Sequence, residues 1–261
     1  MYGAIIGDIV GSRFEMIDHK RKDFQLFSNR CCFTDDTAMT IAVADALLTD
    51  MDFTAAMQKW GRKYPRAGYG GKFIQWIFSD APKPYGSWGN GSAMRVSPCA
   101  LMAKSLEEAL ELAEKSALVS HNHPEGIKGA KAIAAAVYLA KTGSGKESIK
   151  KYVEDNFYSL DFTLDQIRPR YRFDASCQGS VPQAIRAFLE SSDFEDAIRN
   201  AVSLGGDSDT IGAMVGSIAW SFYSREGGAT ARMNEIWTEA SGYLPDDMLA
   251  ITRKFAENVD R

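Results

Sequence analysis

Apolar residues recur every three to four positions along almost the whole chain, and this helical spacing is what most constrains the fold. Capping-box patterns, typical of helix starts, precede three of these segments, at Ser105/Glu108, Thr163/Gln166 and Ser192/Glu195. Pro182 stands where the first turn of a further helix would begin. The sustained period-two alternation that a half-buried sheet needs is missing. We therefore predict an all-α fold.

Size and charge narrow the class of protein. The chain has 261 residues, of which 45% are hydrophobic, enough for a sizeable core within one domain over residues 1–261. Its 30 basic and 34 acidic residues give a net charge of −4. Without a basic excess to neutralise phosphates, nucleic acid is not expected as the main partner. No pattern indicates the oligomeric state.

The cysteines and the apolar segments suggest a cellular location. Cys31, Cys32, Cys99 and Cys177 lack metal-ligand spacing, and a disulfide scaffold is not expected in a chain of this length. The first residues do not form a signal-peptide pattern, and no apolar segment reaches transmembrane length. We expect a soluble, reduced, cytoplasmic protein that does not use a membrane as a partner.

Two short acidic segments, residues 33–37 (FTDDT) and 206–210 (GDSDT), each precede a long apolar, helix-forming segment. One helix start needs one capping acceptor, worth about 1 kcal/mol, so the second carboxylate in each segment is surplus to folding. If the segments met, like charges about 4 Å apart would repel by roughly 4 kcal/mol at an effective dielectric near 20. A cation between them is therefore expected. Because the available ligands are oxygens, Mg²⁺ or Mn²⁺ fits better than zinc.

Small residues repeat every four positions beside these segments. Gly3, Gly7 and Gly11 form one such series, and Gly212 and Gly216 form another. Each interior glycine costs a helix about 1 kcal/mol relative to alanine. The series therefore indicates that another backbone or a ligand approaches closely. Asp8 and Glu15, seven residues apart, would share one side of the first helix if that helix extended far enough.

A loop of different character, residues 83–95 (KPYGSWGNGSAMR), lies in the middle of the chain. Its prolines and glycines are expected to prevent helix formation before Ala93. Free N–H groups, small side chains and aromatic residues suit a diphosphate with a base or sugar nearby.

Two other patterns are weaker. Residues 141–147 (KTGSGKE) resemble a phosphate-binding P-loop, but Ala140 and Glu147 occupy positions where that motif needs Gly and Ser or Thr. Gly143 is better interpreted as a helix C-cap. His121 and His123 lack a nearby third nitrogen ligand for zinc, although one of them could contact a ligand.

Several of these features together resemble the ADP-ribosylglycohydrolase family, which includes the dinitrogenase reductase-activating glycohydrolases. The resemblance extends in order from about Gly3 to Trp220. The matching features are Gly7-Asp8 with Glu15, residues 34–37, residues 89–95, Ser120-His121 and residues 206–210.

The resemblance implies a compact, single-domain orthogonal helical bundle with a binuclear metal site in a surface cleft. It implies two Mg²⁺ ions, or alternatively Mn²⁺, and these metal ligands: Thr34, Asp35, Asp36, Asp207, Asp209 and Thr210. It implies contacts with ADP-ribose from Gly86, Ser87, Trp88, Gly89, Asn90, Gly91, Ser92 and His121. It places Glu15 beside the scissile bond.

The implied reaction is hydrolysis of the glycosidic bond between the distal ribose of ADP-ribose and an acceptor, which builds oxocarbenium character in the sugar. Asp209, Asp36 or Glu15 could take the proton of the attacking water or assist the leaving group, and the sequence does not choose between them. The acceptor also stays open: an arginine or serine side chain of a protein, or a small-molecule conjugate such as O-acetyl-ADP-ribose.

Other functions fit the residues less well. A non-catalytic ADP-ribose-binding module could keep the loop without the acids. A metal-free hydrolase with two carboxylates would be indifferent to EDTA. A prenyl diphosphate enzyme would need Asp-Asp-x-x-Asp, whereas Met39 follows Thr37 and Ala38 here.

Overall fold

The structure is a computed structural model that describes residues 1–225 and 227–259. Within these ranges the regular structure is helical, with one isolated β-bridge between Gly89 and Ser176 and no strand. The predicted all-α class is confirmed. In chain order the helices are α1 (Tyr2–Ser12), α2 (Asp35–Leu47), α3 (Phe53–Lys63), α4 (Gly71–Phe78), α5 (Gly91–Met94), α6 (Ser97–Met102), α7 (Leu106–Leu118), α8 (Pro124–Lys141), α9 (Lys146–Asn156), α10 (Leu164–Ile167), α11 (Cys177–Leu189), α12 (Phe194–Leu204), α13 (Ser208–Tyr223), α14 (Ala231–Ser241) and α15 (Asp246–Val259).

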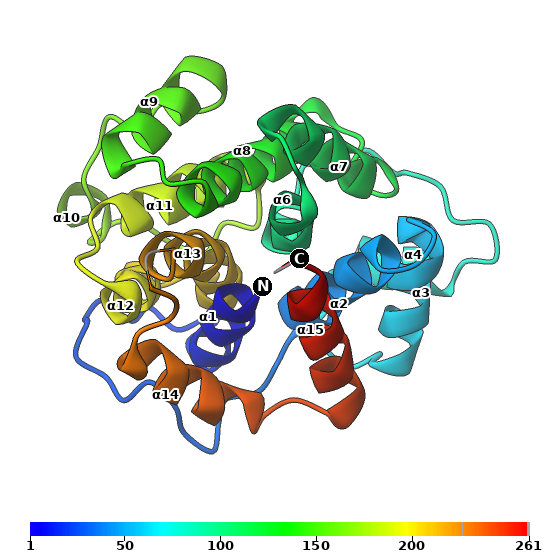
Figure 1. Cartoon of the computed structure of the whole chain (residues 1–261), viewed down its shortest axis with the longest axis horizontal. Helices are drawn as coiled ribbons and strands as arrows, with labels where there is room; N and C mark the ends of the chain where they lie inside the picture. The colour runs from blue at the N-terminus through cyan, green and yellow to red at the C-terminus, as the bar shows by residue number, and fades with distance from the viewer. Residues whose placement is uncertain (226, 260–261) are drawn as a thin grey trace.

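Helix α13 lies inside the bundle. Its residues from Ser208 to Ala219 are all buried, and α1, α8, α11 and α12 pack around it (Figure 1). A helix that is apolar on every side is stable in water only when neighbours cover all of its faces. None of the helices in the described ranges is both long and apolar enough to cross a bilayer.

Helices α1 and α13 run antiparallel with their backbones in close contact. A Cβ atom placed on Gly3 would lie 1.9 Å from the carbonyl oxygen of Gly216, and one on Gly7 would lie 1.9 Å from that of Gly212. One on Gly11 would lie 2.3 Å from the oxygen of Ser208. The two glycine series therefore pack against each other. Of the two possibilities that the sequence left open, a second backbone rather than a ligand approaches these glycines.

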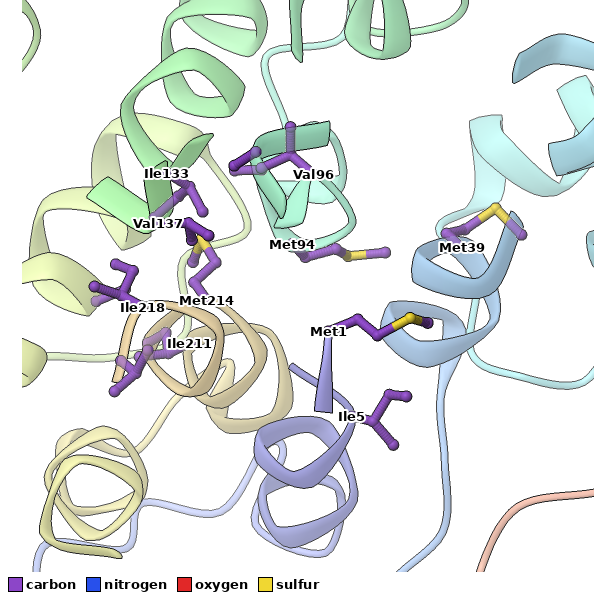
Figure 2. Packing of buried hydrophobic residues seen from close by; sticks show 14 of the residues in the cluster. Met1, Ile5, Met39, Met94, Val96, Ile133, Val137, Ile211, Met214 and Ile218 are labelled. Carbon is purple, nitrogen blue, oxygen red and sulfur yellow. The ribbon is translucent and has the colours of Figure 1, made fainter. Parts of the chain in front are cut away.

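One continuous hydrophobic core joins the helices around this pair. Figure 2 shows members of this core: Met1 and Ile5 at the α1 end, Met39 on α2, and Val137 of α8 beside Met214 of α13. At about 25 cal/mol per Å² of buried apolar surface, such side chains supply most of the stabilisation that holds the helix ends in place.

Two of the three predicted helix caps are confirmed. Thr163 and Gln166 form the predicted capping box, and Ser105 accepts from the N–H of Glu108. The third cap lies one residue later than predicted, because the carboxylate of Asp193, not Ser192, accepts from the N–H of Asp196 at 2.8 Å.

Two predicted helix starts need correction. Pro182 lies inside α11, which begins at Cys177 because the Ser176 hydroxyl caps the N–H of Gly179 at 3.0 Å. The predicted non-helical stretch before Ala93 is also slightly too long, because α5 begins at Gly91. Gly143 follows the end of α8 with a φ of +96°, as the C-cap interpretation requires.

Candidate active site

The glycine contact between α1 and α13 sets the register of the candidate site. Because Gly7 faces Gly212 and Gly11 faces Ser208, the second half of α1 lies against the first turn of α13. Asp8 follows Gly7 directly, and Asp209 lies in that first turn. The close backbone packing of α1 against α13 therefore also brings together Asp8 and Asp209, which are 201 positions apart in the sequence.

Asp8 fastens the start of α2 to α1. Its Oδ2 accepts hydrogen bonds from the backbone N–H groups of Thr34 (2.9 Å) and Thr37 (3.0 Å). Its Oδ1 accepts one from the Thr34 hydroxyl at 2.7 Å. A carboxylate offers about four acceptor positions, so Asp8 uses three of them on α2. We assign Asp8 chiefly to holding this helix start.

Carboxylates from α1, from the turn after it, from the first turn of α2 and from the start of α13 come together in two groups. Ligand oxygens of Asp8, Asp36 and Asp209 lie within 4.8 Å of one another, and so do those of Glu15, Asp207 and Asp209. Asp209 belongs to both groups. The two acidic segments of the sequence therefore meet in space, which is the condition under which a cation between them is expected, and they form two adjacent groups around one shared aspartate.

The charges in this cluster are unbalanced. Burial, together with neighbouring carboxylates, raises the pKa of Asp36 and of Asp209 well above the usual range. Burial followed by the charges of Asp8 and Asp207 raises the pKa of Asp35 to about 8. Among the described residues, no lysine or arginine forms an ion pair with any of these carboxylates. The cluster therefore lacks the positive charge that buried carboxylates require.

The donor set fits hard divalent cations. The Oδ1 atom of Asp36 is buried without a hydrogen-bond partner, and its Oδ2 faces the hydroxyls of Thr34 (3.1 Å) and Thr210 (3.2 Å). An orphaned carboxylate oxygen in an all-oxygen cluster is the arrangement that Mg²⁺ or Mn²⁺ can complete. Asp35 lies outside both groups but lines the adjoining cleft.

The turn before α13 places Asp207. Gly205 and Gly206 both have positive φ angles, +69° and +76°, which glycine adopts without strain. Lys20 holds this turn by donating to the carbonyl oxygens of Leu204 (2.5 Å) and Tyr171 (2.7 Å). The Asp207 carboxylate then accepts from the Asn90 side chain at 2.7 Å. Asp207 thereby connects the acidic cluster to the loop of residues 83–90.

Glu15 reaches the cluster by a route that the sequence interpretation missed. Helix α1 ends at Ser12, so Asp8 and Glu15 do not share one helical face. Glu15 lies in the following turn, just before Met16, which has a φ of +62° that is uncommon for a non-glycine residue. The side chain is exposed, and burial of part of it, with the charges of Asp207 and Asp8, raises its pKa.

A cleft of about 280 Å³ opens beside the cluster. Of the predicted residues, those that line it are Glu15, Asp35, Ser87, Gly89, Asn90, Gly91, His121, Asp207 and Thr210. Three N–H groups of the loop already have acceptors: Gly86 donates to the Asn122 side chain, Gly89 to the Ser87 hydroxyl and Asn90 to the Ala175 carbonyl. Within the described residues, the N–H groups of Ser87 and Trp88 have none, so part of the predicted anion cradle remains available.

The remaining predicted loop residues lie elsewhere. Ser92 is buried and donates to the Gly126 carbonyl at 2.7 Å, so it holds the loop against α8. Gly86 and Trp88 line a smaller hollow next to the cleft, and the Trp88 ring is exposed 5.5 Å from that of His123.

Some positioning residues were not selected from the sequence. Asp8 was paired with Glu15 in the sequence but was not predicted to hold the start of α2, and the signal for that role is the antiparallel match of the two glycine series. Asn122, which holds Gly86, lies between the two histidines that drew attention there. Lys20 belongs to a basic stretch whose long-range contacts carry no local signal.

Comparisons with known proteins identify the family of the chain. A sequence model of the ADP-ribosylglycohydrolase family matches residues 1–227. The chain belongs to the ADP-ribosylglycohydrolase family. Its similarity to that family includes every element that forms the acidic cluster and the cleft.

Individual relatives extend the comparison. The chain is 27% identical to ADP-ribosylhydrolase ARH3 of Homo sapiens, over 95% of this chain and 90% of the relative. It is also 27% identical to ARH3 of Bos taurus, with coverage of 95% and 89%, and 24% identical to ADP-ribosylarginine hydrolase Tri1 of Pseudomonas putida, with coverage of 87% and 70%. A solved structure, an ADP-ribosylglycohydrolase-related protein complex, shares the fold with a TM-score of 0.70 at 23% identity, with coverage of 96% and 94%.

Proposed function

We propose that this protein hydrolyses the glycosidic bond between the distal ribose of ADP-ribose and an acceptor, and so removes ADP-ribose from proteins or small molecules. The family membership supports the reaction class. The observation that carries the proposal is the pair of carboxylate groups sharing Asp209 at one end of the cleft. A pure ADP-ribose-binding module would have no need for these unbalanced charges.

The chain's own residues would hold two divalent cations. Asp36 and Asp209, with the hydroxyls of Thr34 and Thr210 nearby, would form one position, and Glu15, Asp207 and Asp209 the other. Asp35 lies at the cleft side of the first position. When bound, Mg²⁺ or Mn²⁺ would supply Lewis-acid stabilisation of negative charge on oxygen and orient the sugar hydroxyls.

Proton handling falls to the carboxylates nearest the cleft. Glu15 is exposed at the cleft, and partial burial together with the charges of Asp207 and Asp8 raises its pKa, so it holds a proton more readily than a free glutamate does. Asp36 and Asp209 are buried, whereas the exposed Glu15 side chain lines the cleft. We therefore favour Glu15 as the group that takes a proton from the attacking water or assists the leaving group.

The rest of ADP-ribose would occupy the cleft away from the acids. The free N–H groups of Ser87 and Trp88 suit the diphosphate, because backbone donors and neutral side chains can approach phosphate oxygens closely. His121 and the small residues Gly89 and Gly91 line the adjoining wall.

Release of free ADP-ribose from arginine-linked, serine-linked and O-acetyl conjugates, each with Mg²⁺, Mn²⁺ or EDTA, tests the proposal. We expect metal-dependent release from at least one conjugate, which would also identify the acceptor. Tight ADP-ribose binding without any release would instead support the non-catalytic module. Release that persists in EDTA would contradict the role of the cations.

A further inference from the structure

Arg95 is a fully buried cation without a carboxylate partner. It follows the helix α5 that ends the cleft loop, and the described residues include no ion pair to it. One terminal nitrogen donates to the Ser116 carbonyl oxygen and to the Ser120 hydroxyl oxygen, each at 3.0 Å. The guanidinium lies over the Phe73 ring, 5.4 Å from its centroid. Burial of a charged group costs free energy, and these few polar contacts offset only part of that cost.

The contact with Arg95 determines the direction of the next hydrogen bond. The Ser120 oxygen lies 2.8 Å from Nδ1 of His121, and Ser120 is fully buried. An arginine can only donate, so Ser120 must accept from Arg95. The described residues offer the Ser120 proton no acceptor other than Nδ1 of His121. If Nδ1 carried its own proton, the serine hydroxyl would be left as a buried, unpaired donor.

His121 is therefore an acceptor at Nδ1 and carries its proton at Nε2. Burial and the charge of Arg95 lower the pKa of His121 well below the usual value, which keeps the ring neutral. Tyr85, whose pKa is raised by burial, also faces the ring, 6.0 Å away between centroids, and Glu15, Asp35, Lys72 and Asp207 line the same cleft. On the remaining sides lie Phe73, Gly126 and the loop glycines.

The Nε2 atom is directed at the loop of the cleft. A Cβ atom on Gly91 would lie 3.1 Å from it, and one on Gly89 would lie 3.7 Å from it. Among the described residues, Nε2 has no hydrogen-bond partner, although His121 lines the cleft. The absence of a side chain at both glycines leaves this donor reachable by a ligand.

We propose that Arg95 and Ser120 are positioning residues that fix His121 as a neutral ring whose Nε2–H donates into the cleft. Its acceptor would be an oxygen of the ADP-ribose ligand, so this part of the inference rests on the proposed function. On this side of the cleft, Arg95 then carries the positive charge beneath the loop, and His121 is a neutral hydrogen-bond donor.

Nitrogen-15 NMR of the histidine rings tests the proposal in the ligand-free protein. The chain has three histidines, and His121→Gln identifies the signals that belong to His121. We expect an unprotonated Nδ1 and a protonated Nε2 that stay unchanged between about pH 5 and pH 8, because the ordinary histidine pKa of about 6.5 is strongly lowered here. A protonated Nδ1, or a ring that titrates near pH 6.5, would overturn the proposal.

Two variants of Ser120 extend the test. Ser120→Ala should give a mixture of tautomers and weaken ADP-ribose binding about threefold to tenfold, the range for one neutral hydrogen bond. Ser120→Thr, which keeps the hydroxyl, should restore both the tautomer and the affinity. An unchanged tautomer in Ser120→Ala would contradict the role of Ser120. If the wild-type tautomer is as expected but ADP-ribose does not bind, the proposed function fails while the assignment of His121 stands.

Discussion

Asp209 is the residue on which both carboxylate groups depend. We expect Asp209→Asn to abolish turnover and to weaken binding of both cations, whereas Asp36→Asn should abolish turnover by disturbing one group. Each loss should exceed about 100-fold in kcat, because an electrostatic contact realised in the transition state is removed. ADP-ribose release and Mn²⁺ titration calorimetry measure the two effects.

Asp161 provides the matched control for these variants. It is an exposed aspartate in the segment before α10 that belongs to neither carboxylate group and does not line the cleft, so Asp161→Asn should leave kcat unchanged. Full activity in either Asp36→Asn or Asp209→Asn would show that the cluster does not carry the chemistry.

Substitution of Glu15 is expected to change kcat more than the affinity for ADP-ribose. Because its side chain is exposed at the cleft and belongs to one carboxylate group only, Glu15→Gln should lower kcat at least tenfold while ADP-ribose affinity changes less than about threefold. Steady-state kinetics and ADP-ribose titration give the two quantities. Equal losses in kcat and affinity would instead assign Glu15 to holding the ligand.

At the scale of the element, the contact between α1 and α13 is both a packing feature and the frame of the site. A Cβ on Gly7 would lie 1.9 Å from the Gly212 carbonyl oxygen, so Gly7→Ala must separate the helices. We expect a loss of about 2–4 kcal/mol in the free energy of unfolding, measured by urea titration.

Gly71→Ala is the control for this variant. Gly71 begins α4, and a Cβ placed there would meet nothing within 4 Å. Its free energy of unfolding should change by less than about 0.5 kcal/mol. A Gly7→Ala protein as stable as Gly71→Ala would contradict the close backbone contact.

The helices and the acidic segments were predictable from the sequence because their signals are local. Helical spacing and caps such as Thr163 with Gln166 depend on neighbours a few residues away. The start of α11 was misjudged because the Ser176 cap outweighed the preference of Pro182 for a first turn. The role of Asp8 was not predictable, because it depends on how α1 meets the start of α2 in three dimensions.

At the scale of the whole molecule, the unbalanced acids should couple stability to pH and to cations. In the ion-free protein, carboxyls such as Asp35, with a pKa raised from 3.8 to about 8, bind protons more tightly than in the unfolded chain. Protonation of these carboxyls therefore contributes fully to the free energy of unfolding below about pH 4, and this contribution is lost as the pH rises toward about 8.

Cations should reverse this loss, because they replace the missing positive charge. We expect the rise in Tm on adding Mn²⁺ to EDTA-treated protein to be larger at pH 8 than at pH 5, as measured by differential scanning calorimetry. An equal rise at both pH values would show that cations do not compete with protons for these carboxylates.

The central claim is that the two carboxylate groups that share Asp209 would each hold a divalent cation. Anomalous diffraction from crystals grown with Mn²⁺ tests it most directly. We expect two peaks, one among Asp36, Asp209 and the hydroxyls of Thr34 and Thr210, the other among Glu15, Asp207 and Asp209. No peak at the cluster, with the carboxylates arranged as here, would contradict the claim.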